Sequence, residues 1–193
     1  MIRRIISGGQ TGADRGGLDA AIELGIAHGG WCPKGRRAED GEIPARYALT
    51  ETAGRSYRER TDLNVRSSDG TVIFYRGRLE GGSRRTADTA RKEGKPRLLV
   101  RIEHMGEAVE SEFRAWVAEH RIEVLNVAGN RESRAPGIQQ LVKRFLLRVL
   151  PPKAYEAAEK TRLPAEGEAA GLPLAAEAEG KYRRTPLRRR PQR

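Results

Sequence analysis

The sequence predicts an α/β fold built on a parallel sheet with helices on both faces. Short apolar runs alternate with amphipathic helical patterns along residues 1–150. The runs are almost continuously apolar, which is typical of parallel strands that are buried on both sides. Glycine-rich turns follow several of these runs. Together these observations favour repeated strand–helix units.

In the first half of the chain, residues 2–6 form an isoleucine-rich strand. Residues 15–24 follow as a helix, because Leu18, Ala21 and Leu24 fall on one side and Gly25 is a typical stop. Residues 27–32 are a weaker strand, since two consecutive glycines interrupt it. A polar helix over 56–65 and a β-branched, aromatic strand over 71–75 complete this half.

The second half alternates more regularly. Residues 83–93 form a helix that ends at Gly94 and is followed by Pro96. Residues 98–102 and 123–127 are strands, and the helix between them, 108–120, places Phe113 and Trp116 on one face. Residues 136–150 form the last helix, with an apolar face toward the core. The expected ligand-binding domain therefore spans residues 1–150.

Composition changes at Pro151-Pro152. Residues 151–193 are rich in Ala, Glu, Pro and Arg and poor in large apolar side chains, so we expect a largely flexible basic tail. The net charge of +11 suits an anionic ligand. Residues 181–193 are basic but contain a single aromatic residue, Tyr182. Because binding of single strands needs aromatic platforms and base recognition needs groove-reading elements, the sequence argues against nucleic acid as the partner.

Several function classes are disfavoured by what the chain contains. Its apolar runs are too short for a transmembrane helix, and its N-terminus lacks the apolar region of a signal peptide. We therefore expect a cytoplasmic protein without a membrane partner. The single cysteine, Cys32, is expected to be a small buried residue, and the scattered histidines show no metal-ligand spacing. We expect no protein-bound metal and assign no catalytic residue.

Three glycine-rich loops end at the carboxyl edge of the expected sheet, where ligands of open α/β sheets bind. They are residues 7–14, 76–86 and 128–137. Gly81-Gly82-Ser83 opens a helix and is the best candidate for a phosphate cradle, to which Thr86 would add a hydroxyl. The loops match neither a dinucleotide fingerprint nor a Walker A motif. Alternatively, their glycines only shape tight turns and Asp14 only caps a helix.

Residues 31–44 form a long loop at the same edge, where Trp31 could pack beside a flat ring or simply anchor the loop. Lys34 adds positive charge there. The candidate ligand-binding residues of the whole edge are Gly8, Gly9, Gln10, Thr11, Gly12, Asp14, Lys34, Asn64, Gly81, Gly82, Ser83, Thr86, Asn130, Glu132 and Ser133.

Four segments in order, GGQTGADRGGLDAAIELGI, GWCPKGRRAEDGEIP, YRERTDLNV…SDGTVI and LEGGSRRT, resemble the molybdenum cofactor carrier protein family. That family is similar to a circular permutation of the Rossmann-like, lysine-decarboxylase-like (LOG) nucleotide-binding proteins. The resemblance covers about residues 1–150 and implies a Rossmann-like three-layer sandwich. It also implies a homo-oligomer (a dimer or tetramer) and a bound molybdenum cofactor (molybdopterin), whose dithiolene holds the metal. Ser67 stands where relatives are expected to have an acid.

The leading hypothesis is a non-enzymatic carrier or binding protein for a phosphorylated heterocycle. The alternative is a phosphoribohydrolase that cleaves the ribose–base bond of nucleoside monophosphates. Such hydrolases carry a P-G-G-x-G-T-x-x-E pattern, and here residues 80–89 lack its proline, third glycine and glutamate. An acid is needed to handle the proton at the reacting bond, so this loss favours the binding protein. Asp88 and Glu132 are the acids that could substitute.

Overall fold

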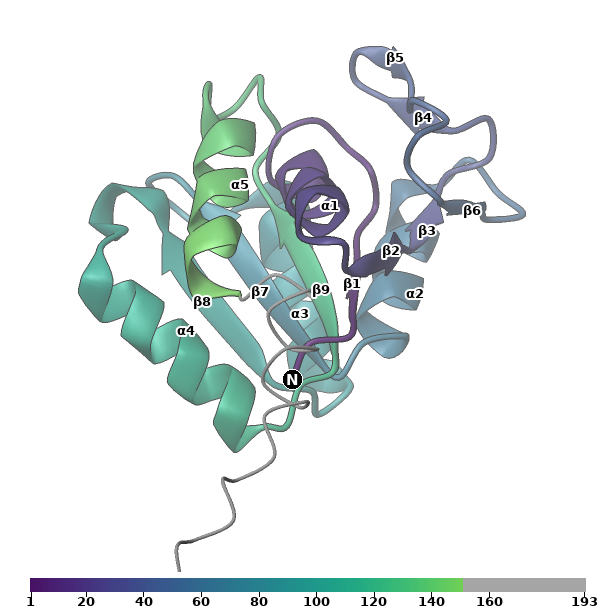
Figure 1. The fold of residues 1–193 in the computed structure, drawn as a ribbon. Coiled ribbons are helices and arrows are strands. Elements are labelled where there is room, and N and C mark those ends of the chain that lie inside the picture. Colours follow the sequence, from purple (N-terminus) through teal and green to yellow (C-terminus); the bar gives the residue numbers. More distant parts are fainter. Residues whose placement is uncertain (151–193) are drawn as a thin grey trace, which may run out of the picture. The chain divides into compact units, whose positions relative to one another are not determined.

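Five strands form the central sheet of the computed structural model, which describes residues 1–150. The strand order is β2-β1-β9-β7-β8, and every neighbouring pair is parallel. Helices α1, α4 and α5 cover one face, and α2 and α3 cover the other (Figure 1). This confirms the Rossmann-like three-layer sandwich. The expected tail, residues 151–193, lies outside the described residues.

Each element lies within a few residues of its predicted position. The sheet strands are β1 (Arg4–Ile6), β2 (Ala27–Gly29), β7 (Gly70–Tyr75), β8 (Arg97–Arg101) and β9 (Val124–Gly129). The helices are α1 (Ala13–Leu24), α2 (Tyr57–Arg66), α3 (Gly81–Lys92), α4 (Glu107–Glu119) and α5 (Ile138–Val149), with a short 3-10 turn, η1 (Ile102–His104).

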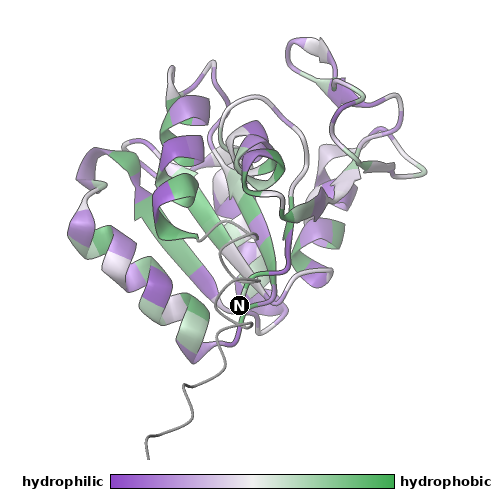
Figure 2. Ribbon diagram, in the orientation of Figure 1, coloured by the Kyte–Doolittle hydropathy of each residue, from purple (hydrophilic) through white to green (hydrophobic). Residues whose placement is uncertain are grey.

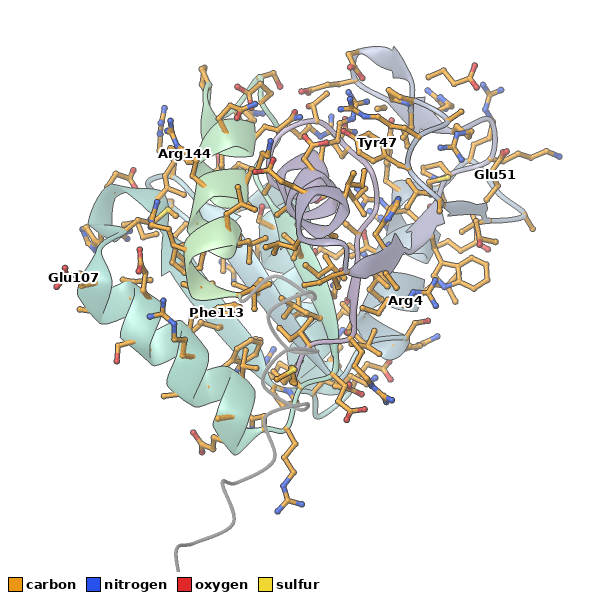
Figure 3. All side chains as sticks on the ribbon, viewed as in Figure 1. Arg4, Tyr47, Glu51, Glu107, Phe113 and Arg144 are labelled. Atoms are coloured by element: carbon orange, nitrogen blue, oxygen red, sulfur yellow. The ribbon has the colours of Figure 1, made fainter. Side chains whose placement is uncertain are left out.

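The core lies on both faces of the sheet, as strand alternation requires. Val72 and Phe74 of β7 face the cluster formed with α1, α4 and α5, whereas Ile73 packs with Ala87 of α3. Figure 2 shows the central strands as the most apolar part of the fold. Phe113 points from α4 toward the sheet (Figure 3), and its ring meets Phe145 edge-on at 5.5 Å. Such pairs add to the burial of apolar area.

The predicted strand over 27–32 is wrong in one respect, because it is split in two. Gly30 breaks it with a φ of 123°, and a Cβ there would lie 2.2 Å from the carbonyl oxygen of Ser7. The chain then leaves the sheet as β3 (Trp31–Cys32), which pairs with β6 (Thr50–Glu51). Between them lies a small hairpin, β4 (Arg37–Ala38) and β5 (Gly41–Glu42), where a plain loop was expected.

Cys32 is buried beneath this excursion, packed with Leu18, Ile43 and Tyr47. Burial raises the pKa of its thiol. This confirms the expected role of a small buried residue.

Candidate functional site

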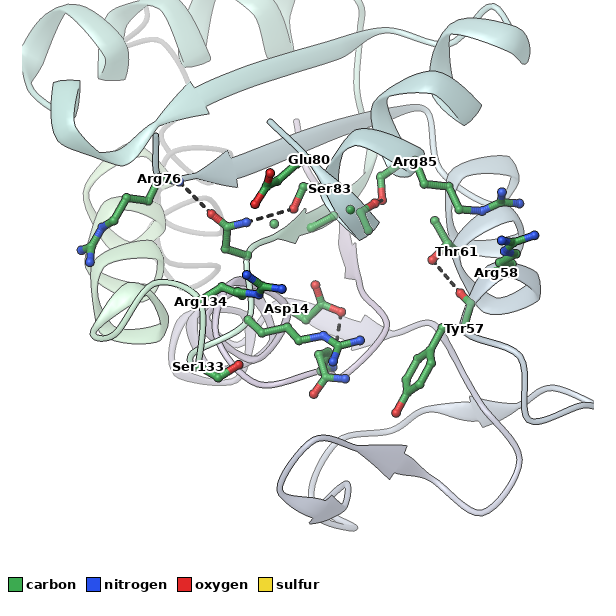
Figure 4. A pocket seen from close by; sticks show the side chains of 18 of the residues that line it. Asp14, Tyr57, Arg58, Thr61, Arg76, Glu80, Ser83, Arg85, Ser133 and Arg134 are labelled. Carbon is green, nitrogen blue, oxygen red and sulfur yellow. Dashed lines mark hydrogen bonds between the residues drawn. The ribbon is translucent and has the colours of Figure 1, made fainter. Parts of the chain in front are cut away.

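A cavity of about 940 Å³ opens at the carboxyl edge of the sheet, where β7 and β9 end and α1, α2 and α3 begin (Figure 4). This is the edge at which the sequence predicts a ligand. Of the candidate residues, the cavity wall includes Gln10, Asp14, Gly81, Gly82, Ser83, Thr86, Asn130 and Ser133.

The wall is dominated by arginine. Asp14 and Glu80 are its acidic residues, against seven arginines: Arg58, Arg60, Arg76, Arg78, Arg85, Arg131 and Arg134. Several arginines around one hollow create a positive potential, and their planar guanidinium groups suit phosphate oxygens. Positive charge therefore dominates the wall of the cavity.

The first turn of α3 forms one side of the cavity. Glu80 precedes this helix but provides no side-chain cap, so its first N–H groups are available to a ligand. Gly81 and Gly82 have nothing within 4 Å of the position that a Cβ would take. A phosphate can therefore approach this backbone without meeting a side chain.

Asn130 holds this turn in place against the end of β7. Its carboxamide oxygen accepts a 2.7 Å hydrogen bond from the backbone N–H of Arg76, and its Nδ2 donates to Ser83 Oγ over 3.4 Å. Both bonds are visible in Figure 4. Asn130 thus connects the loop after β9 to the opening of α3.

Thr86 lines the cavity, but its hydroxyl is already engaged. Oγ1 donates to the carbonyl oxygen of Gly82 over 3.0 Å, within the same helix. A hydroxyl has one hydrogen to give, so the donation to an anion that the sequence suggested competes with this bond.

A buried ion pair forms the floor beside α1. Arg60 donates to Asp14 Oδ2 over 2.9 Å, and the two side chains are 14% and 6% exposed. The backbone N–H of Gln10 donates to the same oxygen. Burial raises the pKa of Asp14, and the charge of Arg60 opposes that shift. Asp14 is therefore more than the helix-capping residue of the simpler interpretation.

Three buried side-chain nitrogens of residues 1–150 have no hydrogen-bond partner: Gln10 Nε2, Arg60 Nε and Arg85 Nε. All three belong to residues of this cavity wall, and all three are donors. For Gln10 the orientation of the carboxamide is fixed, because its oxygen accepts from the backbone N–H groups of Thr11 and Glu39. Unpaired buried donors cost free energy, and acceptors on a ligand would offset that cost.

The glycines of the first loop do not line the cavity, because protein atoms fill the space that they leave. A Cβ on Gly8 would lie 1.5 Å from the guanidinium of Arg60, and one on Gly12 would lie 2.5 Å from the carbonyl oxygen of Asn130. Gly9 faces Leu49. These residues allow the site to assemble without bordering its open space.

Four other candidates also lie away from the cavity wall. Asn64 bonds the backbone N–H and C=O of Trp31. Glu132 accepts from the backbone N–H groups at the start of α5. Lys34 is exposed, and Thr11 donates its hydroxyl to Glu39.

The hairpin β4–β5 is tied to the edge of the site by its acidic tip. Ser133 donates to Glu39 over 2.6 Å, and Arg15 donates to both oxygens of Asp40 over 2.6 and 2.7 Å. These bonds from Arg15 lower the pKa of Asp40. The long loop over residues 31–44 is thereby anchored beside the cavity.

Sequence reasoning missed most of the arginines and Tyr57, the aromatic residue of the wall. From α2, predicted above only as a polar helix, Asn64 was the one residue assigned to the ligand-binding edge. Trp31, considered as a partner for a flat ring, lies off the cavity and donates its indole N–H to Ser67. Position in the chain is the signal that could have identified Tyr57. It is the first residue of α2, and this helix follows the segment that leaves and returns to the central sheet.

Within residues 1–150, no three His, Cys, Asp or Glu side chains are arranged to hold a metal ion. Nor does any helix of that part of the chain have the length and apolar character needed to cross a membrane.

Comparison with known proteins places the chain in a family. Residues 5–150 match the circularly permutated YpsA SLOG family. The crystal structure of a protein from Syntrophus aciditrophicus, named "putative molybdenum carrier protein", is similar at 45% sequence identity and a TM-score of 0.74. The match covers 77% of this chain and 94% of that one. No curated protein sequence matches. The chain belongs to the circularly permutated YpsA SLOG family.

Proposed function

We propose that the cavity binds a phosphorylated heterocycle and that the chain is a binding or carrier protein for it. The observation that carries this proposal is the coincidence of seven arginines with an uncapped, glycine-opened helix on one cavity wall. Arginine and a free helix N-terminus both recognise phosphate. The unpaired donors on the same wall add to this support.

The ligand we propose is the molybdenum cofactor. The carrier name of the similar Syntrophus protein supports it, and the chemistry of the cavity fits. The phosphate of the pterin would lie at Gly81-Gly82-Ser83, and the dithiolene of the pterin would hold the metal, so the proposal needs no metal ligand from the protein. A volume of about 940 Å³ lies in the range of small-molecule sites.

Titration calorimetry with the full chain tests the proposal, using molybdenum cofactor, a pterin phosphate and a purine nucleotide as probes. Gly82→Val places a side chain over the helix opening. Gly82 has open space around it and no positive φ, so the variant should fold, which circular dichroism would verify. Binding should fall below detection.

Gly106→Val is the matched control, because Gly106 is a glycine next to the first residue of α4, has open space and lies off the cavity. It should bind as wild type does. A folded Gly82→Val protein with wild-type affinity would show that the phosphate binds elsewhere.

Hydrolysis of an N-glycosidic bond is the second candidate, and Asp14 is the observation that favours it. The two acids considered as substitutes are engaged elsewhere: Glu132 at the start of α5, and Asp88 with Arg84 and Arg91. Asp14 instead lies in the cavity wall with a raised pKa. Incubation with nucleoside monophosphates, followed by chromatography for free base, decides the matter. Release that persists in Asp14→Asn would exclude Asp14 from the reaction.

We also propose a homo-oligomer. The family resemblance supports it, as does Leu99, a large apolar side chain that is 42% exposed on the edge strand β8. Light scattering should return a multiple of the 21.4 kDa chain mass. A mass near that of one chain would refute the proposal.

A further inference from the structure

Among the described residues 1–150, Tyr57 is the sole aromatic residue in the wall of the cavity. It begins α2, is half-buried, and stands at the end of the cavity near the β4–β5 excursion (Figure 4). Guanidinium groups flank its ring: Cζ of Arg131 lies 5.3 Å from the ring centroid, and Cζ of Arg60 lies 5.9 Å away.

The two arginines differ in how firmly they are held. Arg60 is fixed by its buried pair with Asp14 and by the space that Gly8 leaves for it. Arg131 is 43% exposed, and its nearest acid, Glu39, is 3.9 Å away. A loosely held, flat, delocalised cation on an aromatic ring occupies the position that a flat heterocycle would take. Arg131 can leave that position at little cost, whereas Arg60 cannot.

The cavity therefore has two chemically distinct ends. The opening of α3 presents backbone N–H groups without an aromatic surface, and the Tyr57 end presents an aromatic face beside Arg60 and Asp14. We propose that the ring of the ligand stacks on Tyr57 in the position now held by the guanidinium of Arg131, while the phosphate lies at α3. This inference rests on the proposed function and assigns the end of the site that selects a heterocycle over a simple phosphate.

The test compares a ligand that has a ring with one that has none. The probes are a pterin phosphate, a purine nucleoside monophosphate and inorganic pyrophosphate, titrated into the full chain. Tyr57→Ala should weaken both ring-bearing probes by about tenfold to a hundredfold, the range for loss of one stacking surface. Pyrophosphate should bind to the variant as it does to wild type. Tyr57→Phe, which keeps the ring, should retain affinity for all three.

Tyr75 supplies a matched control, because Arg101 stands over its ring at 5.8 Å and Tyr75 lies off the cavity. Tyr75→Ala should leave all three affinities unchanged. Pterin fluorescence gives a second readout, since stacking on the phenol ring of Tyr57 should quench it in wild type but not in Tyr57→Ala.

The outcomes separate this inference from the proposed function. An equal loss of pyrophosphate and ring-bearing probes in Tyr57→Ala would mean that Tyr57 only supports the fold of the site. Unchanged binding of ring-bearing probes would place the ring elsewhere. A wild-type chain that binds pyrophosphate but no heterocycle would overturn the inference and leave an anion site. A wild-type chain that binds no probe would overturn both.

Discussion

Two glycine-rich loops, one after β1 and one after β7, lie at the carboxyl edge of this sheet and use glycine for opposite purposes. In the loop that precedes α1, the space beside Gly8 and Gly12 is filled by Arg60 and by the backbone after β9. In the turn that opens α3, the space beside Gly81 and Gly82 is empty. The first loop uses glycine to bring protein close to protein, and the second uses it to leave room for a ligand. Glycine content alone does not distinguish the two.

The largest expected effect is on stability, in the first loop. Gly12→Ala would place a methyl group 2.5 Å from the carbonyl oxygen of Asn130 at a φ of +80°. Overpacking against rigid backbone and the left-handed angle should together cost about 2–5 kcal/mol of unfolding free energy. Urea denaturation measures this. Gly82→Ala, in open space, should stay within about 0.5 kcal/mol of wild type, and equal costs for the two variants would remove the distinction.

Substitutions at Gly8 and at Arg60 should have coupled effects on the free energy of unfolding. A methyl group on Gly8 would push the guanidinium of Arg60 away from Asp14, leaving a buried carboxylate without its partner. In an Arg60→Ala background that clash is gone, so Gly8→Ala should cost much less. A double-mutant cycle by urea unfolding should give a coupling of about 1–3 kcal/mol. Additive costs would show that Gly8 is required for another reason.

Gln10 is the part of the first loop that we expect a ligand to reach. Gln10→Glu keeps the oxygen that accepts from Thr11 and Glu39 but replaces the unpaired Nε2 with an anionic oxygen. Affinity for an anionic ligand should fall about tenfold or more, which is at least about 1.4 kcal/mol. Gln140→Glu makes the same charge change on the exposed side of α5 and should have no effect on calorimetric affinity. Similar losses in both variants would indicate a general charge effect.

The ion pair between Asp40 of the β4–β5 hairpin and Arg15 should contribute little to the free energy of unfolding, and only while Asp40 is ionised. Its pKa is lowered by hydrogen bonds from Arg15, so the native state binds fewer protons than the unfolded chain. The contribution is complete above the unfolded pKa of about 4 and is lost as pH falls through the folded value. Because Asp40 is 47% exposed, Asp40→Asn should cost at most about 1 kcal/mol at pH 7.

The difference in stability between wild type and Asp40→Asn should vanish in strong acid, where the Asp40 carboxyl of the wild type is also neutral. Thermal unfolding across pH 2–7 checks this, with Glu42→Gln on the same hairpin as control. A cost that persists at pH 2 would assign the effect to the shape of the side chain.

The order and type of the main elements were predictable because their signals are local. Continuous apolar strands and the stop at Gly94 required no knowledge of the rest of the chain. The split after Gly29 was not predictable, since it depends on Ser7 and Asn64 approaching Gly30 from distant parts of the sequence. The position of the hairpin tip was also not predictable, because Glu39 and Asp40 accept hydrogen bonds from Thr11, Arg15 and Ser133 in other segments of the chain.

The site was predictable in position and only partly in composition. Ligands of open parallel sheets bind at the carboxyl edge, and that rule identifies the correct loops. Which side chains border the space depends on packing, as Asn64 and Glu132 illustrate: both are used to hold backbone rather than to face the cavity. Tyr57 and Arg58 were missed because they lie on α2, and a polar helix looks the same in sequence whether it faces water or a ligand.

The smallest expected effect sharpens the comparison within the second loop itself. Thr86 lies one turn into α3 and borders the cavity, so it shares the location of the glycines that leave room for the ligand. Its hydroxyl hydrogen is already donated to Gly82, however, and an anion would have to break that bond to gain another. Thr86→Ala should therefore change calorimetric affinity for a pterin phosphate by less than about threefold, or 0.7 kcal/mol. A tenfold loss would mean that the hydroxyl turns to the ligand on binding, and that the opening of α3 is rearranged by its anion rather than formed in advance.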